Sequence, residues 1–90
     1  MSEQIIERMV TVGSASGLHA RPAAVFVQRA KSFQSEISLA KNEKSVNGKS
    51  LLSVLTLGAE QGDQITLSAR GEDAEAAISA LAALLEENLG

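Results

Sequence analysis

The sequence predicts an α+β fold in which three helices cover one face of a four-stranded, mainly antiparallel sheet. Two observations support this βαββαβα open-faced sandwich. Three segments carry apolar residues three or four positions apart, which is the spacing of helices with one buried face. The other segments favour strands, and Thr66 and Ser68 alternate with apolar residues as in a sheet with one face in water. In order, the predicted elements are a strand over 5–12, a helix over 20–33, strands over 36–41 and 45–46, a helix over 51–57, a strand over 64–69 and a helix over 74–85.

The strands differ in how clearly they alternate. In the first strand apolar and polar residues alternate, but Ile5 and Met9 blur the pattern. The second and third strands are joined by a polar turn over 41–44. The pair Asn47-Gly48 could form a second hairpin turn. We interpret it instead as the corner that leads into the next helix.

Capping residues mark the ends of two helices. Ser50 is a good N-cap for the helix over 51–57, Gly58 is a suitable stop, and Asp73 is expected to cap the last helix. The apolar stripe of the first helix consists of Ala23, Phe26, Ala30 and Phe33, and that of the last helix consists of Ala74, Ala77, Ile78, Leu81, Leu84 and Leu85.

Length and composition restrict the class of protein. Ninety residues make a single domain, 1–90. The absence of cysteine excludes disulfides and thiolate catalysis, and it fits a cytoplasmic protein. The net charge of −3 and the lack of tryptophan and tyrosine argue against nucleic acid binding. No signal-peptide pattern or long apolar run is found, so we expect no membrane insertion. Nothing points to a metal or a cofactor, and we expect a monomer.

The stretch 17–24 holds the only histidine and the only proline of the chain, His19 and Pro22. Pro22 has a fixed φ and no N–H group, so it suits the start of a helix. The free N–H groups of a first helical turn attract phosphate. A neutral imidazole nitrogen is a nucleophile, and the guanidinium of Arg21 can clamp phosphate oxygens with paired hydrogen bonds. The stretch therefore predicts a site where His19 takes up a phosphoryl group.

Charge is divided unevenly along the chain. The segment 19–49 is net positive, whereas the segment 50–90 is net negative, with Arg70 as its only basic residue. This division favours an acidic or phosphorylated protein partner near His19. The alternative is a chance division over a solvated surface.

The stretch 49–58 is the most hydrophobic part of the chain. In a helix this short, Val54 and Leu57 share one face, which we expect to be buried. An apolar patch exposed to water then consists of Leu51, Leu52 and Leu55. The alternative is that all of these residues belong to the core.

These two stretches together resemble the HPr family, the histidine-containing phosphocarrier proteins of the bacterial phosphoenolpyruvate-dependent sugar phosphotransferase system. Residues 17–24, Gly-Leu-His-Ala-Arg-Pro-Ala-Ala, match the family's phosphohistidine motif. Residues 49–58, Lys-Ser-Leu-Leu-Ser-Val-Leu-Thr-Leu-Gly, look like its regulatory-serine motif. The spacing of the motifs, the element order and the length agree, so the resemblance covers nearly the whole chain.

The resemblance implies a mechanism. Phosphorylated Enzyme I passes a phosphoryl group to Nδ1 of His19, Arg21 contacts that group, and phospho-His19 hands it to the EIIA domains of sugar permeases. Pro22 starts the helix. Ser50 aligns with the serine that HPr kinase/phosphorylase modifies, although a serine here also serves as a plain N-cap. The docking surface comprises Ala20, Leu51, Leu52 and Leu55.

Two other classes of function are alternatives to the phosphocarrier. A regulatory module of the same fold, in carbon or nitrogen control, would bind a transcriptional regulator or a kinase through Ser50 and the leucine patch. Family relatives of that kind lack the active histidine, which is present here. A true enzyme would need a second acid or base, and the sequence places no carboxylate near His19. We therefore expect a carrier and not an enzyme.

Overall fold

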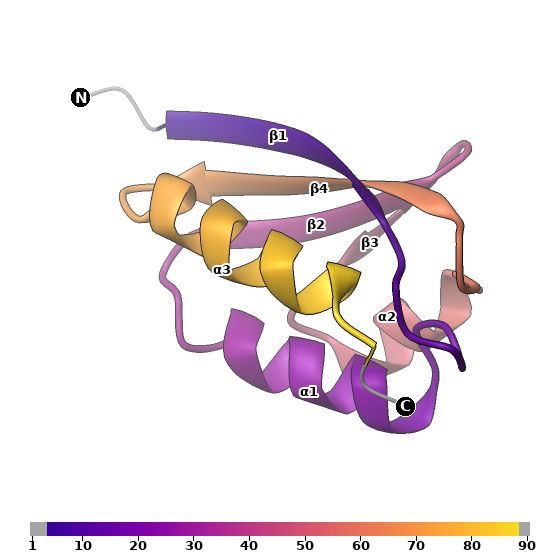
Figure 1. Ribbon diagram of the computed structural model, residues 1–90. Coiled ribbons are helices and arrows are strands. Elements are labelled where there is room, and N and C mark those ends of the chain that lie inside the picture. The colour runs from indigo at the N-terminus through magenta and orange to yellow at the C-terminus, as the bar shows by residue number, and fades with distance from the viewer. Residues whose placement is uncertain (1–3, 89–90) are drawn as a thin grey trace.

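The computed structural model describes residues 4–88 and contains one sheet with helices on one of its faces (Figure 1). The strands lie in the order β1-β4-β2-β3, and every neighbouring pair is antiparallel. This arrangement confirms the predicted fold class. The elements are β1 (Gln4–Thr11), α1 (Ala20–Ala30), β2 (Glu36–Lys41), β3 (Lys44–Asn47), α2 (Leu51–Thr56), β4 (Gln64–Gly71) and α3 (Ala74–Glu86).

The two faces of the sheet differ as the alternation predicts. In β4, Ile65 and Leu67 are buried under the helices, whereas Thr66 and Ser68 on the other face are half-buried. Met9 lies opposite Thr66 in the register of β1 and β4, so it belongs to the open face. It is 63% exposed. Ile5 lies on the same face four positions earlier, opposite Arg70, so the apolar residues that blur the alternation of β1 are exposed residues of the open face.

The first helix is shorter than predicted, because α1 ends at Ala30 and not at residue 33. After Ala30 the chain tightens into turns between residues three positions apart, in which Ser32 N–H donates to the carbonyl of Arg29 and Phe33 N–H to that of Ala30. The hydroxyl of Ser32 also donates to the Arg29 carbonyl, at 2.6 Å. Serine competes in this way with helical hydrogen bonds. Phe33 still packs half-buried against the core.

The prediction that the side chain of Asp73 caps the last helix is wrong. Asp73 stands at the N-cap of α3, but its side chain makes no hydrogen bond to that helix. Its carboxylate accepts from the backbone N–H groups of Gln34 and Ser35 and from the buried hydroxyl of Ser35. The carboxylate therefore ties the start of α3 to the loop before β2 instead of capping its own helix.

The surroundings of α2 follow the prediction closely. The hydroxyl oxygen of Ser50 accepts from the N–H of Ser53, so Ser50 is the N-cap of α2. Gly58 follows the helix with φ +68°, a conformation that glycine adopts freely. Asn47 is the last residue of β3 and opens the corner before α2, where its side-chain oxygen accepts from the N–H of Lys49. None of the helices within residues 4–88 has the length and apolar character to cross a bilayer.

Candidate functional site

His19 stands directly before α1, at its N-cap position. Its backbone is extended, with φ −119° and ψ 161°, and its side chain makes no capping hydrogen bond. The side chain is 42% exposed. The imidazole is thus not used by its own helix, and it faces a loop from elsewhere in the chain.

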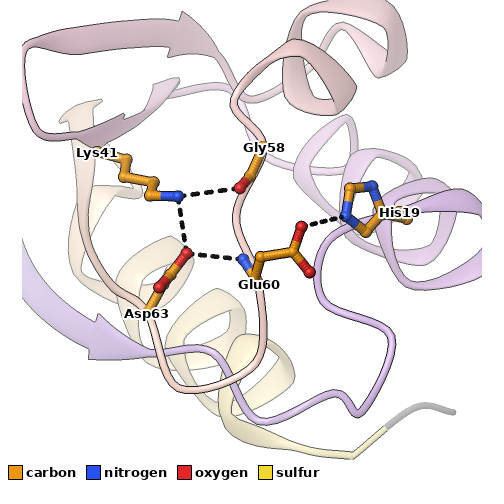
Figure 2. A network of polar contacts seen from close by, with 5 residues as sticks. All are labelled: His19, Lys41, Gly58, Glu60 and Asp63. Carbon is orange, nitrogen blue, oxygen red and sulfur yellow. Dashed lines mark hydrogen bonds and ion pairs between the residues drawn. The ribbon is translucent and has the colours of Figure 1, made fainter.

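Glu60, in the loop between α2 and β4, is the partner of that imidazole (Figure 2). Its Oε2 lies 3.1 Å from Nε2 of His19. The other ring nitrogen is on the side of the ring turned away from Glu60 (Figure 2). The expectation that no carboxylate lies near His19 is therefore wrong. The two residues are 41 positions apart, and no local pattern in the sequence joins them.

A backbone contact brings the two loops together. The N–H of Leu18 donates to the carbonyl of Ala59 at 2.9 Å. Gly17 makes this approach possible in two ways. It has φ +71°, and a Cβ at this position would lie 2.5 Å from the Ala59 carbonyl oxygen. Glycine is thus the residue that allows the loop before His19 to reach the loop that carries Glu60.

The loop of Glu60 is fixed by a small network of polar contacts (Figure 2). The N–H of Glu60 donates to Oδ2 of Asp63 at 2.8 Å, and the same oxygen pairs with Nζ of Lys41 at 2.8 Å. Lys41 also donates to the carbonyl of Gly58 at 3.0 Å. The hydrogen bond from Lys41, aided by that from the Glu60 N–H, holds the pKa of the Asp63 carboxyl below its ordinary value. Both sides of Glu60 are thereby anchored to β2.

A second set of contacts supports the loop over 13–17 from the end of α3. The N–H of Gly13 donates to the carbonyl of Leu85 at 2.9 Å, and the hydroxyl of Ser14 donates to that of Glu87 at 3.1 Å. The N–H of Ala15 donates to the side-chain oxygen of Asn88 at 3.1 Å. The segment that leads to His19 is therefore held by the loop over 58–63 on one side and by the C-terminal end of α3 on the other.

The residues after His19 form the first turn of α1. Ala20 is exposed and has φ +41°, which is unusual for a residue with a side chain and is a form of strain found at functional sites. Pro22 is buried and is the third residue of α1, as in the helix predicted over 20–33, so it lies in the first turn but not at the first position. At this position its missing N–H still costs no helical hydrogen bond.

Arg21 is exposed and borders a shallow hollow that is lined by other residues of α1 and by Leu84 of α3. Among residues 4–88, no hydrogen bond or ion pair joins its guanidinium to His19. Arg21 is thus close to His19 in the sequence, but its exposed side chain does not contact the imidazole.

The surface of α2 divides as predicted except at Leu55, which was expected in the exposed patch. Val54 is fully buried and Leu57 is 5% exposed, whereas Leu51 is 41% and Leu52 75% exposed. Leu55 is half-buried and packs against the core. The patch is therefore real but is centred on Leu51 and Leu52, and the alternative in which all these residues belong to the core is wrong.

The exposed leucine patch of α2 is continuous with the surface of α1, the helix that follows His19. Leu51 borders a hollow together with Ala24, Gln28 and other residues of α1. Ala24 and Gln28 also border the hollow of Arg21. One surface therefore runs from Arg21 across α1 to Leu51. Within the described part of the chain, no group of three or more histidine, aspartate or glutamate side chains is arranged to hold a metal ion.

Comparison with known proteins gives a consistent result. Residues 6–87 match the family model described as "PTS HPr component phosphorylation site". The chain is 51% identical over 83 residues to the phosphocarrier protein HPr of Buchnera aphidicola, covering 92% of this chain and 98% of that protein. It is 41% identical over 85 residues to the HPr-like protein Crh of Bacillus subtilis, covering 94% of this chain and 100% of that protein.

The solved structures agree with the sequence matches. The crystal structure of the phosphocarrier protein HPr from Bacillus anthracis superposes with a TM-score of 0.88 at 42% identity, covering 90% of this chain and 96% of that one. With the family model spanning residues 6–87, the chain belongs to the HPr family of the phosphotransferase system.

Proposed function

We propose that this chain is a phosphocarrier in sugar uptake. His19 accepts a phosphoryl group from phosphorylated Enzyme I and passes it to the EIIA domains of sugar permeases. The observation that carries this proposal is the state of the His19 ring. It is partly exposed at the start of α1, and Nε2 is engaged by Glu60, which leaves Nδ1 as the nitrogen for a phosphoryl group.

The proposed chemistry is the transfer of a phosphoryl group between two proteins through His19, without a bound small-molecule substrate. The Nδ1 lone pair attacks the phosphorus atom, a P–N bond forms, and the bond between phosphorus and the donor group of Enzyme I breaks. The group leaves when a nucleophile of the next protein attacks the phosphorus atom, the P–N bond to His19 breaks, and its electron pair returns to Nδ1. The chain thus acts as a carrier that is chemically modified and restored, and not as an enzyme with a substrate pocket of its own.

Arg21 is proposed to contact the phosphoryl group once it is in place. Its guanidinium offers a planar set of donors that match phosphate oxygens. In the unphosphorylated protein the side chain is exposed, and no hydrogen bond or ion pair within residues 4–88 holds it at His19. It can therefore move to the group without breaking a structural contact.

Partner docking is proposed to use the surface between α1 and α2. Ala20, Leu51 and Leu52 are exposed, and Leu55 is half-buried at the edge of the same patch. Apolar side chains beside a basic segment suit partners with an apolar, acidic surface. The protein is proposed to act as a single-domain monomer in the cytoplasm.

A second candidate function is regulation through Ser50, in carbon or nitrogen control. The similarity to the HPr-like protein Crh of Bacillus subtilis favours it, since a solved Crh structure is described as that of a catabolite repression protein. Phosphate added to Ser50 by HPr kinase/phosphorylase would place about −1.5 to −2 charges beside Leu51. That charge would oppose an acidic partner and favour a different one, such as a transcriptional regulator.

The mass of the intact protein tests the carrier function. Incubation with phosphoenolpyruvate and an Enzyme I should add one acid-labile phosphoryl group to the wild type and to Ser50→Ala, but none to His19→Ala. If the wild type gains nothing from an Enzyme I of the same organism, the carrier function is wrong. Phosphorylation of the Ser50 hydroxyl by ATP and HPr kinase/phosphorylase would then favour the regulatory role.

A further inference from the structure

We infer that Glu60 is a positioning residue for the phosphoryl group, because it holds a proton on Nε2 of His19 in both the free and the phosphorylated state. The inference rests on the proposed carrier function and adds to it a residue outside the phosphohistidine motif.

The contact itself assigns the proton. An ionised carboxylate has no hydrogen to donate and can only accept, so in the 3.1 Å contact between Glu60 Oε2 and His19 Nε2 the ring nitrogen is the donor. A neutral imidazole carries a single N–H group. With that hydrogen on Nε2, the lone pair of the ring lies on Nδ1, on the side of the ring away from Glu60 (Figure 2).

The same proton stays in place during transfer. When Nδ1 bonds to phosphorus while Nε2 keeps its hydrogen, the ring becomes an imidazolium cation. When the P–N bond breaks, the electron pair returns to Nδ1 and the ring is neutral again. No proton has to enter or leave in either direction. A carboxylate at Nε2 stabilises the cationic form, because the contact becomes a charge-assisted hydrogen bond.

Contacts of the surrounding loop fix the position of Glu60. Its backbone N–H is held by Asp63, Asp63 is paired with Lys41 of β2, and the preceding residue Ala59 accepts from Leu18 next to His19. These contacts use backbone groups and neighbouring residues, and the side chain of Glu60 takes no part in them. A change confined to the Glu60 carboxylate therefore leaves the loop intact.

The experiment compares Glu60→Gln with the wild type by ¹⁵N NMR of the labelled imidazole. Phospho-His19 is prepared with Enzyme I and phosphoenolpyruvate, and in parallel with phosphoramidate, a small donor that needs no docking surface. At fixed pH near 7, we compare the phospho-His19 rings that carry a proton on Nε2 with those that do not. The ratio of the two should fall about two- to fivefold in Glu60→Gln, which is the effect expected for the loss of a partly exposed ion pair. The maximal rate at which phosphorylated Enzyme I modifies His19 should fall by a similar factor, with little change in the KM of Enzyme I for this protein.

The control is Glu72→Gln, which removes the same charge in the turn after β4, at the opposite end of that strand from the Glu60 loop. It should leave the protonated fraction and the rate unchanged. A protonated fraction in Glu60→Gln equal to that of the wild type overturns the inference. If the protein is loaded by phosphoramidate but not by Enzyme I, the carrier function fails, while the NMR ratio on the chemically loaded protein still decides the role of Glu60.

Discussion

Gly17 has a backbone conformation that favours glycine, and it allows the loop before His19 to approach the loop of Glu60. We expect Gly17→Ala to lower the free energy of unfolding by about 1–3 kcal/mol, because the new Cβ is strained at φ +71° and collides with the Ala59 carbonyl. Relief of the collision should also push Glu60 away from His19. Urea unfolding gives the stability, and the rate of His19 phosphorylation gives the effect on the site.

Gly62 provides the matched control for this change. It has φ +87°, but a Cβ there would meet no atom within 4 Å. Gly62→Ala should therefore cost only the backbone strain, about 1 kcal/mol, and should leave phosphorylation unchanged. Equal losses of activity in the two variants would contradict the role of close approach at Gly17.

Asp73 makes stability depend on pH. The hydrogen bond from the Ser35 hydroxyl, with that from the Gln34 N–H, holds the pKa of the Asp73 carboxyl below its ordinary value. A carboxyl with a lowered pKa in the folded state stabilises the fold above its unfolded pKa, about 3.9, and this contribution is lost as the pH falls through the folded pKa. Asp73→Asn should thus be less stable than the wild type at pH 7, and the difference should shrink toward pH 2. Denaturation curves across this range measure it, and a difference independent of pH would contradict it.

Single residues also show where sequence reasoning succeeded. The cap by Ser50 was predictable because its partner Ser53 is three positions away. The partners of Asp73 lie 38 and 39 positions away, and Glu60 lies 41 positions from His19. Such contacts depend on how the loops meet in the folded chain, which local patterns do not encode.

At the scale of elements, α2 depends on its N-cap because it has only six residues. Ser50→Ala should lower the free energy of unfolding by about 1 kcal/mol, since the Ser53 N–H loses its partner. Ser50→Asp should remain close to the wild type, because aspartate caps equally well and favours a helix N-terminus. Urea unfolding of both variants tests this order, and an aspartate variant less stable than the alanine one would contradict it.

The two faces of α2 should respond differently to truncation. Leu52 is 75% exposed, so Leu52→Ala should change stability by less than about 0.5 kcal/mol yet slow transfer from Enzyme I. Val54 is fully buried, so Val54→Ala should cost about 1–3 kcal/mol through lost burial and a cavity. Paired unfolding and transfer measurements check both, and a Leu52→Ala variant with the wild-type transfer rate would remove Leu52 from the docking surface.

Element boundaries were less predictable than element types. The strand over 36–41 has the predicted bounds, because polar residues flank a short apolar alternation. Phe33 continues the apolar stripe of the first helix and so predicts a helix end at residue 33, whereas α1 ends at Ala30. An apolar residue can pack on the core from a turn as well as from a helix, so the stripe alone does not determine where α1 ends.

At the scale of the whole molecule, charge should affect transfer more than folding. The positive segment 19–49 includes His19 and α1, and attraction to an acidic partner is screened by salt. Between roughly 0.05 and 0.5 M salt, we expect the KM for Enzyme I to rise about threefold or more. Stopped-flow or steady-state transfer assays measure this rise, with urea unfolding at both salt concentrations as the control. A KM independent of salt would point to docking by the apolar patch alone.

The junction between the loop over 13–17 and the end of α3 couples the site to the fraying of a helix. The last turns of helices open locally more readily than their centres. When that turn of α3 opens, the N–H of Gly13 loses the Leu85 carbonyl and Ser14 loses the carbonyl of Glu87. We therefore expect the hydrogen-exchange rate of the Gly13 amide to follow the opening of the helix end and not that of β1. Motion of the segment before His19 is then expected to depend on residues 73 positions away in the sequence.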